Sequence, residues 1–341
     1  MHNIIFNLPE QIKDASQIPT KIKKTRGIDY RNIVIAGMGG SGIGGDILRS
    51  LLLPSLKIPV ITMKDYRLPG FVTKNTLFLA VSYSGNTEET LEAFNSARQI
   101  GCHIIAITSG GMLSIYCEKY KIDCIEIPSG ISSRCAIGYL FIPQLLSLSK
   151  LGLIRHMDQD IEETVKTLTH NRKKYENFAR VFAPKLSERL PLVYSTSPLF
   201  VPVATRWQTQ FNENAEIISH TNVLPELDHN EIMGMSDINP LFPLYYLFLI
   251  DPNSHSRNLL RVKLTLEIMK SRFLRTPQQK YFEYRKFLPD GKSDLARIFS
   301  LIMQGDLTSL YLAHIRGVAP ETITAIDELK KKLNNKNKRK G

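Results

Sequence analysis

Two short stretches, Gly37-Met38-Gly39-Gly40-Ser41-Gly42 and Ser82-Tyr83-Ser84-Gly85-Asn86-Thr87, decide the fold of this chain. Each follows a short apolar run typical of a strand and precedes a segment with the period of a helix. The free N–H groups at a helix N-terminus attract an anion, glycine lets the backbone approach it, and hydroxyls add neutral donors. Two such loops therefore predict a pocket for a phosphate group on a small molecule.

The first half of the chain alternates between strand and helix patterns. Pro143 is expected to kink or break one of its helices, and Gly101 to end another. The expected strands cover 32–36, 59–63, 76–81, 103–108 and 122–127, and the expected helices cover 43–53, 87–99 and 135–151.

A polar segment over 156–190 has the period of a helix and predicts a connector to a second, similar half. Pro320 suits the first turn of the final helix. The alternation predicts an α/β fold with parallel, doubly wound sheets. In the second half we expect strands over 192–195 and 244–250, and helices over 202–216, 259–270, 292–316 and 320–333. The expected parts are a domain over 1–155, a connector helix over 156–189, a second domain over 190–333 and a basic tail over 334–341.

The composition is that of a globular protein, with 43% hydrophobic and 22% charged residues in 341. The longest apolar run, 241–250, is too short to span a bilayer and contains Pro243, so it predicts a buried strand and no membrane association. The N-terminus lacks the pattern of a secretory signal. No two cysteines form a CxxC pair, which favours reduced core residues and a cytoplasmic protein. The cysteines are Cys102, Cys117, Cys124 and Cys135.

The formal net charge of +12 raises the question of nucleic-acid binding, but much of the excess lies in the terminal run 330–340. Such a run is typically a solvated chain end, and no nucleic-acid reading module is recognisable. The eight histidines are scattered, no HExxH occurs and the cysteines lack ligand spacing, so we expect no metal and no cofactor.

The first loop also matches the dinucleotide fingerprint, as Gly37-x-Gly39-x-x-Gly42, and Asp65 follows at a suitable distance. This pattern would make the protein a nucleotide-dependent oxidoreductase. Additional glycines in the loop and the second hydroxyl-rich loop, which the fingerprint does not require, count against it. A third interpretation is that both loops are only tight turns.

The second loop and its flanks, Val81–Thr90, resemble the phosphosugar loop of the sugar isomerase (SIS) domain family. Four further stretches resemble the bifunctional phosphoglucose/phosphomannose isomerases, so that the similarity runs from about residue 33 to about residue 333. These stretches are Gly130–Arg134, Asn212–Glu216, Leu227–Glu231 and Leu310–Gly317. The resemblance implies two SIS-type three-layer αβα halves with parallel sheets, followed by C-terminal helices.

The resemblance also implies a metal-independent aldose–ketose isomerase. It would interconvert glucose 6-phosphate, and mannose 6-phosphate if the pocket accepts either C2 configuration, with fructose 6-phosphate through a cis-enediol(ate). Glu213 would move the proton between carbons, His229 would open the sugar ring and Arg134 would stabilise the enediolate. Lys330 best matches the family's lysine in the final helix, although Lys331 and Lys332 adjoin it. The phosphate would be held by Gly40, Ser41, Gly42, Ser82, Ser84 and Thr87.

The resemblance further implies a homodimer in which His229 reaches into the partner's pocket. Taken singly, Glu213 suits a solvated helix, His229 a surface loop and Arg134 an ordinary ion pair. Only their co-occurrence in family-like contexts favours catalysis. The alternative function is a phosphosugar-binding SIS regulator without catalysis, but about thirty residues before the first strand are too few for a helix-turn-helix domain.

Overall fold

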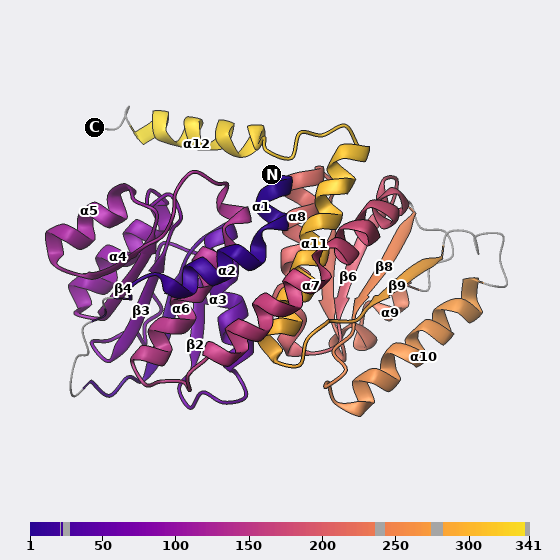
Figure 1. Ribbon diagram of the computed structural model, residues 1–341, viewed down its shortest axis with the longest axis horizontal. Helices are drawn as coiled ribbons and strands as arrows, with labels where there is room; N and C mark the ends of the chain where they lie inside the picture. Colours follow the sequence, from indigo (N-terminus) through magenta and orange to yellow (C-terminus); the bar gives the residue numbers. More distant parts are fainter. Residues whose placement is uncertain (21, 23–27, 236–242, 274–281, 338–341) are drawn as a thin grey trace.

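The N-terminal half is built on a five-stranded parallel sheet with strand order β2-β1-β3-β4-β5. Strands β1 and β3 are buried along their whole length because helices cover both faces. Figure 1 shows the computed structural model, which describes residues 1–20, 22, 28–235, 243–273 and 282–337. The strands are β1 Asn32–Ala36, β2 Val60–Met63, β3 Thr76–Val81, β4 His103–Thr108 and β5 Asp123–Glu126.

The side chains of the sheet alternate between two apolar layers, as the period of a strand requires. Ile33, Leu77 and Ile105 face one core, which includes residues of α3 (Gly39–Leu52) and α6 (Ile137–Lys150). Val34, Phe78 and Ile104 face the other core, with α4 (Glu88–Ile100) and α5 (Gly111–Tyr120). This half is therefore a three-layer αβα sandwich.

The C-terminal half has a four-stranded parallel sheet with strand order β7-β6-β8-β9. One face packs on α10 (Ser256–Phe273), and the other belongs to the large core that also contains residues of α8 (Val201–Ala215) and α11 (Asp294–Ile315). The strands are β6 Leu190–Ser195, β7 His220–Val223, β8 Leu244–Leu249 and β9 Glu283–Phe287.

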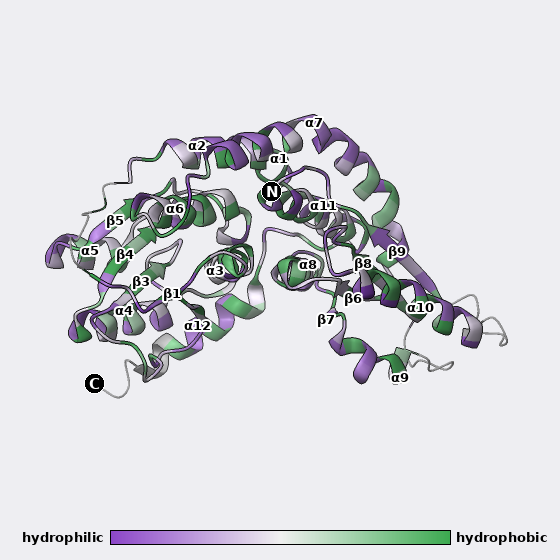
Figure 2. Cartoon of the chain, turned by 90° about the horizontal axis from the view of Figure 1, so that it is seen from below, coloured by the Kyte–Doolittle hydropathy of each residue, from purple (hydrophilic) through white to green (hydrophobic). Residues whose placement is uncertain are grey.

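One continuous apolar core joins the two halves and extends from β1 in the first sheet to β8 in the second. Helix α7 (Asp158–Phe182) bridges the halves, and Figures 1 and 2 both place α8 and α11 between the sheets. Figure 2 shows green hydrophobic segments in α3 and α8, whereas the outer helix α7 carries much hydrophilic purple. Trp207 packs so closely on Gly305 that a Cβ there would lie 2.2 Å from its indole nitrogen. This contact fixes α8 to α11 within the C-terminal half, and the continuous core holds the two halves together.

The remaining elements lie at the ends and in the loops. Helix α12 turns back from the end of α11 toward the N-terminal half (Figures 1 and 2). No helix of the described residues is long and apolar enough to cross a membrane. The remaining elements at the ends and in the loops are α1 His2–Phe6, α2 Leu8–Gln17, η1 Ser133–Cys135, η2 Ala183–Leu186, η3 Pro198–Phe200, η4 Glu226–His229, α9 Ile232–Met235 and α12 Thr324–Asn337.

Most expected strands and helices are confirmed, but the expected starts of two helices were wrong. Helix α3 begins at Gly39 rather than residue 43, because Ser41 and Gly42 already donate their N–H groups to Met38 O. Helix α6 is not broken at Pro143, and the alternative expectation of a kink there stays a prediction. Pro320 lies before α12, which begins at Thr324. The first two residues of the apolar run 241–250 lie outside the described residues.

Candidate active site

The two glycine- and hydroxyl-rich loops lie side by side because they follow neighbouring parallel strands. The backbone N–H of Tyr83 donates to Ser41 Oγ at 3.0 Å, which ties the loop after β3 to the first turn of α3. A Cβ on Gly37 would lie 2.9 Å from Val81 O, so only glycine allows this approach. The contact brings together the two loops that the sequence predicts to form a phosphate pocket.

The hydroxyls of the second loop differ in their surroundings. Ser82 is fully buried, and its Oγ accepts from the N–H of Gly85 at 3.1 Å and lies 2.9 Å from Thr87 Oγ1. Ser84 is exposed, and its Oγ accepts from the N–H of Asn86 at 3.2 Å. Ser82 therefore shapes the loop, while Ser84 has a hydroxyl proton to offer an anion. Of the predicted backbone donors, Gly42 already donates to Met38 O at 3.1 Å.

Gly85 holds this loop in a conformation that other residues rarely adopt. Its φ is +66°, and a Cβ would lie 1.8 Å from Gly110 O. We expect Gly85→Ala to lower the free energy of unfolding by about 2 kcal/mol or more, because both left-handed strain and a backbone clash are introduced. Urea unfolding measures this loss. Gly70→Ala is the matched control, since no atom lies within 4 Å of its Cβ position, and equal stability of the two variants would contradict the steric argument.

Arg134 is buried in η1, directly beneath the first loop. A Cβ on Gly40 would lie 2.8 Å from the Cα of Arg134, so glycine permits this packing. The guanidinium donates from Nε to Asn214 Oδ1 at 2.8 Å and from Nη2 to Pro320 O. Its Nη1 lies 3.6 Å from Glu213 Oε2. The structure thus brings together two of the predicted catalytic residues from different halves of the chain.

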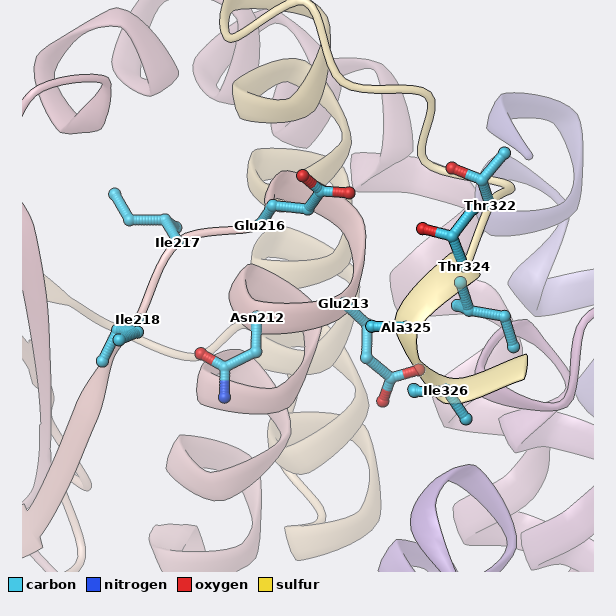
Figure 3. Close-up of a pocket in the computed structure, with 10 residues that line it drawn as sticks. Asn212, Glu213, Glu216, Ile217, Ile218, Thr322, Thr324, Ala325 and Ile326 are labelled. Atoms are coloured by element: carbon cyan, nitrogen blue, oxygen red, sulfur yellow. The ribbon is translucent and has the colours of Figure 1, made fainter. Parts of the chain in front are cut away.

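Glu213 lies at the rim of a cavity of about 500 Å³ between the end of α8 and the start of α12. Its carboxylate points toward the first turn of α12 in Figure 3. The cavity has an apolar wall from Ile217, Ile323 and Ile326. A carboxylate and a guanidinium beside such a cavity can move protons and stabilise developing negative charge. The other lining residues are Asn212, Glu216, Ile218, Thr322, Thr324 and Ala325.

His229 lies apart from this cavity, exposed at the end of η4. Its imidazole forms no hydrogen bond within the part of the chain that the structure describes. The residues that flank it are nevertheless anchored: Asp228 accepts from Arg261 Nη1 and Thr265 Oγ1, both at 2.9 Å. On the other side, Glu231 accepts from Asn222 Nδ2 at 2.6 Å and from Tyr194 Oη. An exposed imidazole on an anchored loop can act on a molecule outside its own subunit's cavity.

Lys330 is also exposed, on the second turn of α12. Only the first turn of that helix, 324–326, lines the cavity. The neighbouring Lys332 forms an i,i+4 ion pair with Glu328 at 2.5 Å. Lys330 therefore lies outside the cavity. Its contact with the substrate stays a prediction, as does the choice of Lys330 over Lys331 and Lys332.

Sequence reasoning missed the residues that support Arg134. Asn214 follows Glu213 in a stretch that carried the family resemblance, but only the acidic residue suggested chemistry. Arg206 donates to Arg134 O at 2.7 Å and forms two bonds to Asp306, at 3.0 and 2.7 Å. Burial raises the pKa of Asp306, and the guanidinium of Arg206 opposes that rise. Helical spacing gives no signal for such pairs, because their partners come from distant segments.

Comparisons with known proteins identify the family of the chain. Residues 28–150 match the SIS domain, and residues 175–333 match the bacterial phospho-glucose isomerase C-terminal SIS domain. The "bifunctional phosphoglucose/phosphomannose isomerase" of Caldicellulosiruptor bescii is 42% identical over 98% of this chain and 98% of its own length. This chain belongs to the bifunctional phosphoglucose/phosphomannose isomerase family.

Other members and neighbours extend the match. The Thermoplasma acidophilum relative of the same name is 40% identical over 89% of this chain and 90% of its own length. Among solved structures, the C-terminal domain of glucosamine-fructose-6-phosphate aminotransferase from Francisella tularensis has a TM-score of 0.70 at 17% identity, covering 95% of this chain and 97% of that one. This likeness confirms the two-half SIS fold. Among the described residues, no three His, Cys, Asp or Glu side chains lie close enough together to hold a metal ion.

Proposed function

We propose that this protein is a metal-independent aldose–ketose isomerase that interconverts glucose 6-phosphate, and mannose 6-phosphate, with fructose 6-phosphate. Membership of the family supports the reaction class. The observation that carries the proposal is the approach of Arg134 Nη1 to Glu213 Oε2 at 3.6 Å, where Glu213 lines the cavity and Arg134 packs against Gly40 of the first loop. A regulator that only bound sugar phosphate would have no need of this pair.

The reaction is an internal redox exchange between two carbons of the sugar. Glu213 would take the C2 proton of the open-chain aldose and return it to C1, while a hydroxyl proton moves from O2 to O1. C1 is thereby reduced, C2 is oxidised and no external electron acceptor is needed. Arg134 would stabilise the negative charge of the cis-enediolate. Protonation of either face at C2 would give the glucose or the mannose configuration.

We assign the remaining roles in line with the family resemblance. His229 would open the sugar ring, and Lys330 would contact the sugar. The exposed position of His229 on an anchored loop supports a homodimer in which this residue serves the partner's cavity. The phosphate would meet Ser41, Ser84 and Thr87 at the two loops, with the N–H of Gly40 as a backbone donor; Ser82 and Gly42 would maintain the loop shape. We also propose that the protein acts in the cytoplasm.

Isomerisation of fructose 6-phosphate by the purified protein tests the proposal, with a chelator present and the hexose phosphates separated by chromatography. Formation of both glucose 6-phosphate and mannose 6-phosphate is the expected result. Glucose 6-phosphate alone would restrict the activity to one isomer, and activity lost in the chelator would contradict the metal-free mechanism. Tight binding of the sugar without turnover would favour the regulator.

Ser84 gives a separate test of where the phosphate binds. We expect Ser84→Ala to raise the KM for fructose 6-phosphate about tenfold with little change in kcat, because one hydrogen bond to a charged group is lost. Steady-state kinetics measure both constants. Ser271→Ala, an exposed serine on α10 whose hydroxyl donates to Ile268 O, is the control. An unchanged KM in Ser84→Ala would place the phosphate elsewhere.

A further inference from the structure

We propose that Asn214 is a positioning residue that fixes the guanidinium of Arg134 against Glu213; this role rests on the proposed isomerase function. Asn214 is fully buried in the last turn of α8, one residue after Glu213. Its side chain spans the space between η1 in the N-terminal half and α11 in the C-terminal half. Because Asn214 itself lies on α8, its bond to Arg134 joins η1 and α8, the two segments that carry Arg134 and Glu213.

The orientation of the Asn214 amide follows from its second partner. Ser309 Oγ donates its single proton to Asp306 O at 2.8 Å. That hydroxyl is therefore left as an acceptor for Asn214 Nδ2, which lies 2.9 Å away. With the amide nitrogen committed to Ser309, the amide oxygen must face Arg134, where it accepts from Nε at 2.8 Å. The flipped amide would set its N–H groups against the N–H of Arg134 Nε, so only this orientation pairs donors with acceptors on both sides.

The guanidinium of Arg134 is consequently held along two of its edges. Asn214 accepts from Nε, Pro320 O accepts from Nη2, and Nη1 remains directed toward Glu213. An asparagine can hold the group without neutralising it, whereas a carboxylate in its place would compete with Glu213 and with an enediolate for the same positive charge. Both the shape and the neutrality of Asn214 therefore suit a cation that must act on something else.

A double-mutant cycle on kcat separates positioning from a general structural role. We expect Asn214→Ala to lower kcat by about 10- to 100-fold with less than about a threefold change in KM, because small misplacements of a catalytic group cost this much. Arg134→Lys lacks the Nε donor and should lower kcat on its own. If Asn214 acts through Arg134, then adding Asn214→Ala to Arg134→Lys should cause little further loss. Additive losses would overturn the proposal.

Two further variants guard against trivial outcomes. Asn32→Ala removes another buried asparagine and should leave kcat near that of the wild type. Asn32 lies at the amino-terminal end of β1, which is the end of the strand far from the loops.

Asn214→Asp keeps the size and the acceptor oxygen, so it remains informative if Asn214→Ala does not fold. We expect its kcat to fall about tenfold or more through the added negative charge; a wild-type kcat would overturn the proposal. Absence of turnover in the wild-type protein would overturn the proposed function, and this role with it, whereas an active wild type with unaffected Asn214 variants would overturn this role alone.

Discussion

Replacing Glu213 with glutamine should lower kcat for fructose 6-phosphate isomerisation by at least about 100-fold while changing KM only a few-fold. The amide has the size of the carboxylate, so the packing at the end of α8 and the 3.6 Å approach to Arg134 Nη1 can persist. It cannot accept the proton from C2, however, and the enediolate would no longer form. Steady-state kinetics with both products measured would test this expectation.

A second carboxylate in the cavity provides the control. Glu216 lines the same space but is the left-handed C-cap residue of α8, with a φ of +48°, and no ion pair to Arg134 is present within the described chain. Glu216→Gln should retain activity within about fivefold, because neutralising a carboxylate that accepts no substrate proton costs little. In deuterated water, Glu213→Gln should also lose exchange of the C2 hydrogen of glucose 6-phosphate. Exchange that persists in Glu213→Gln and disappears in Glu216→Gln would move the base to Glu216.

The strands of the first sheet were predictable because their signal is local. Buried parallel strands such as Thr76–Val81 are short apolar runs between turn residues, and the structure matches that range residue for residue. Strand β9, Glu283–Phe287, escaped prediction because it is an edge strand with a polar sequence and mixed burial. At Pro143 a local rule predicted a kink or a break, and burial of α6 in the shared core kept the helix continuous.

The site was predictable only where a sequence pattern carried chemistry. Arg134 and Glu213 were identified through family-like stretches, and the structure brings them together from positions 79 residues apart. The contacts that support Arg134 form only after the halves pack, so no spacing in the sequence predicts them. The residues that make these contacts are Asn214, Pro320 and Arg206. The roles of all four predicted catalytic residues stay predictions: Glu213 lines the cavity of its own chain, whereas Arg134, His229 and Lys330 do not.

The largest expected effect on stability comes from Asp306. Asp306→Ala should lower the free energy of unfolding by about 3–5 kcal/mol, because it leaves the charge of Arg206 buried without its counterion. Arg206 and Asp306 are 1% and 2% exposed, and two hydrogen bonds join them. Urea unfolding monitored by fluorescence of Trp207, which is the single tryptophan, measures the loss. Glu162→Ala, which breaks an exposed pair with Lys166 on α7, should leave the unfolding curve unchanged.

The paired replacement Arg206→Met with Asp306→Leu separates stability from catalysis. It removes both charges and fills their space with apolar side chains, so most of the lost stability should return. It also removes the donor that holds Arg134 O at 2.7 Å, and kcat should therefore stay well below that of the wild type. Recovery of both stability and kcat would show that the pair is only structural. Recovery of stability alone would mean that this buried ion pair is kept because it anchors the backbone of the catalytic arginine.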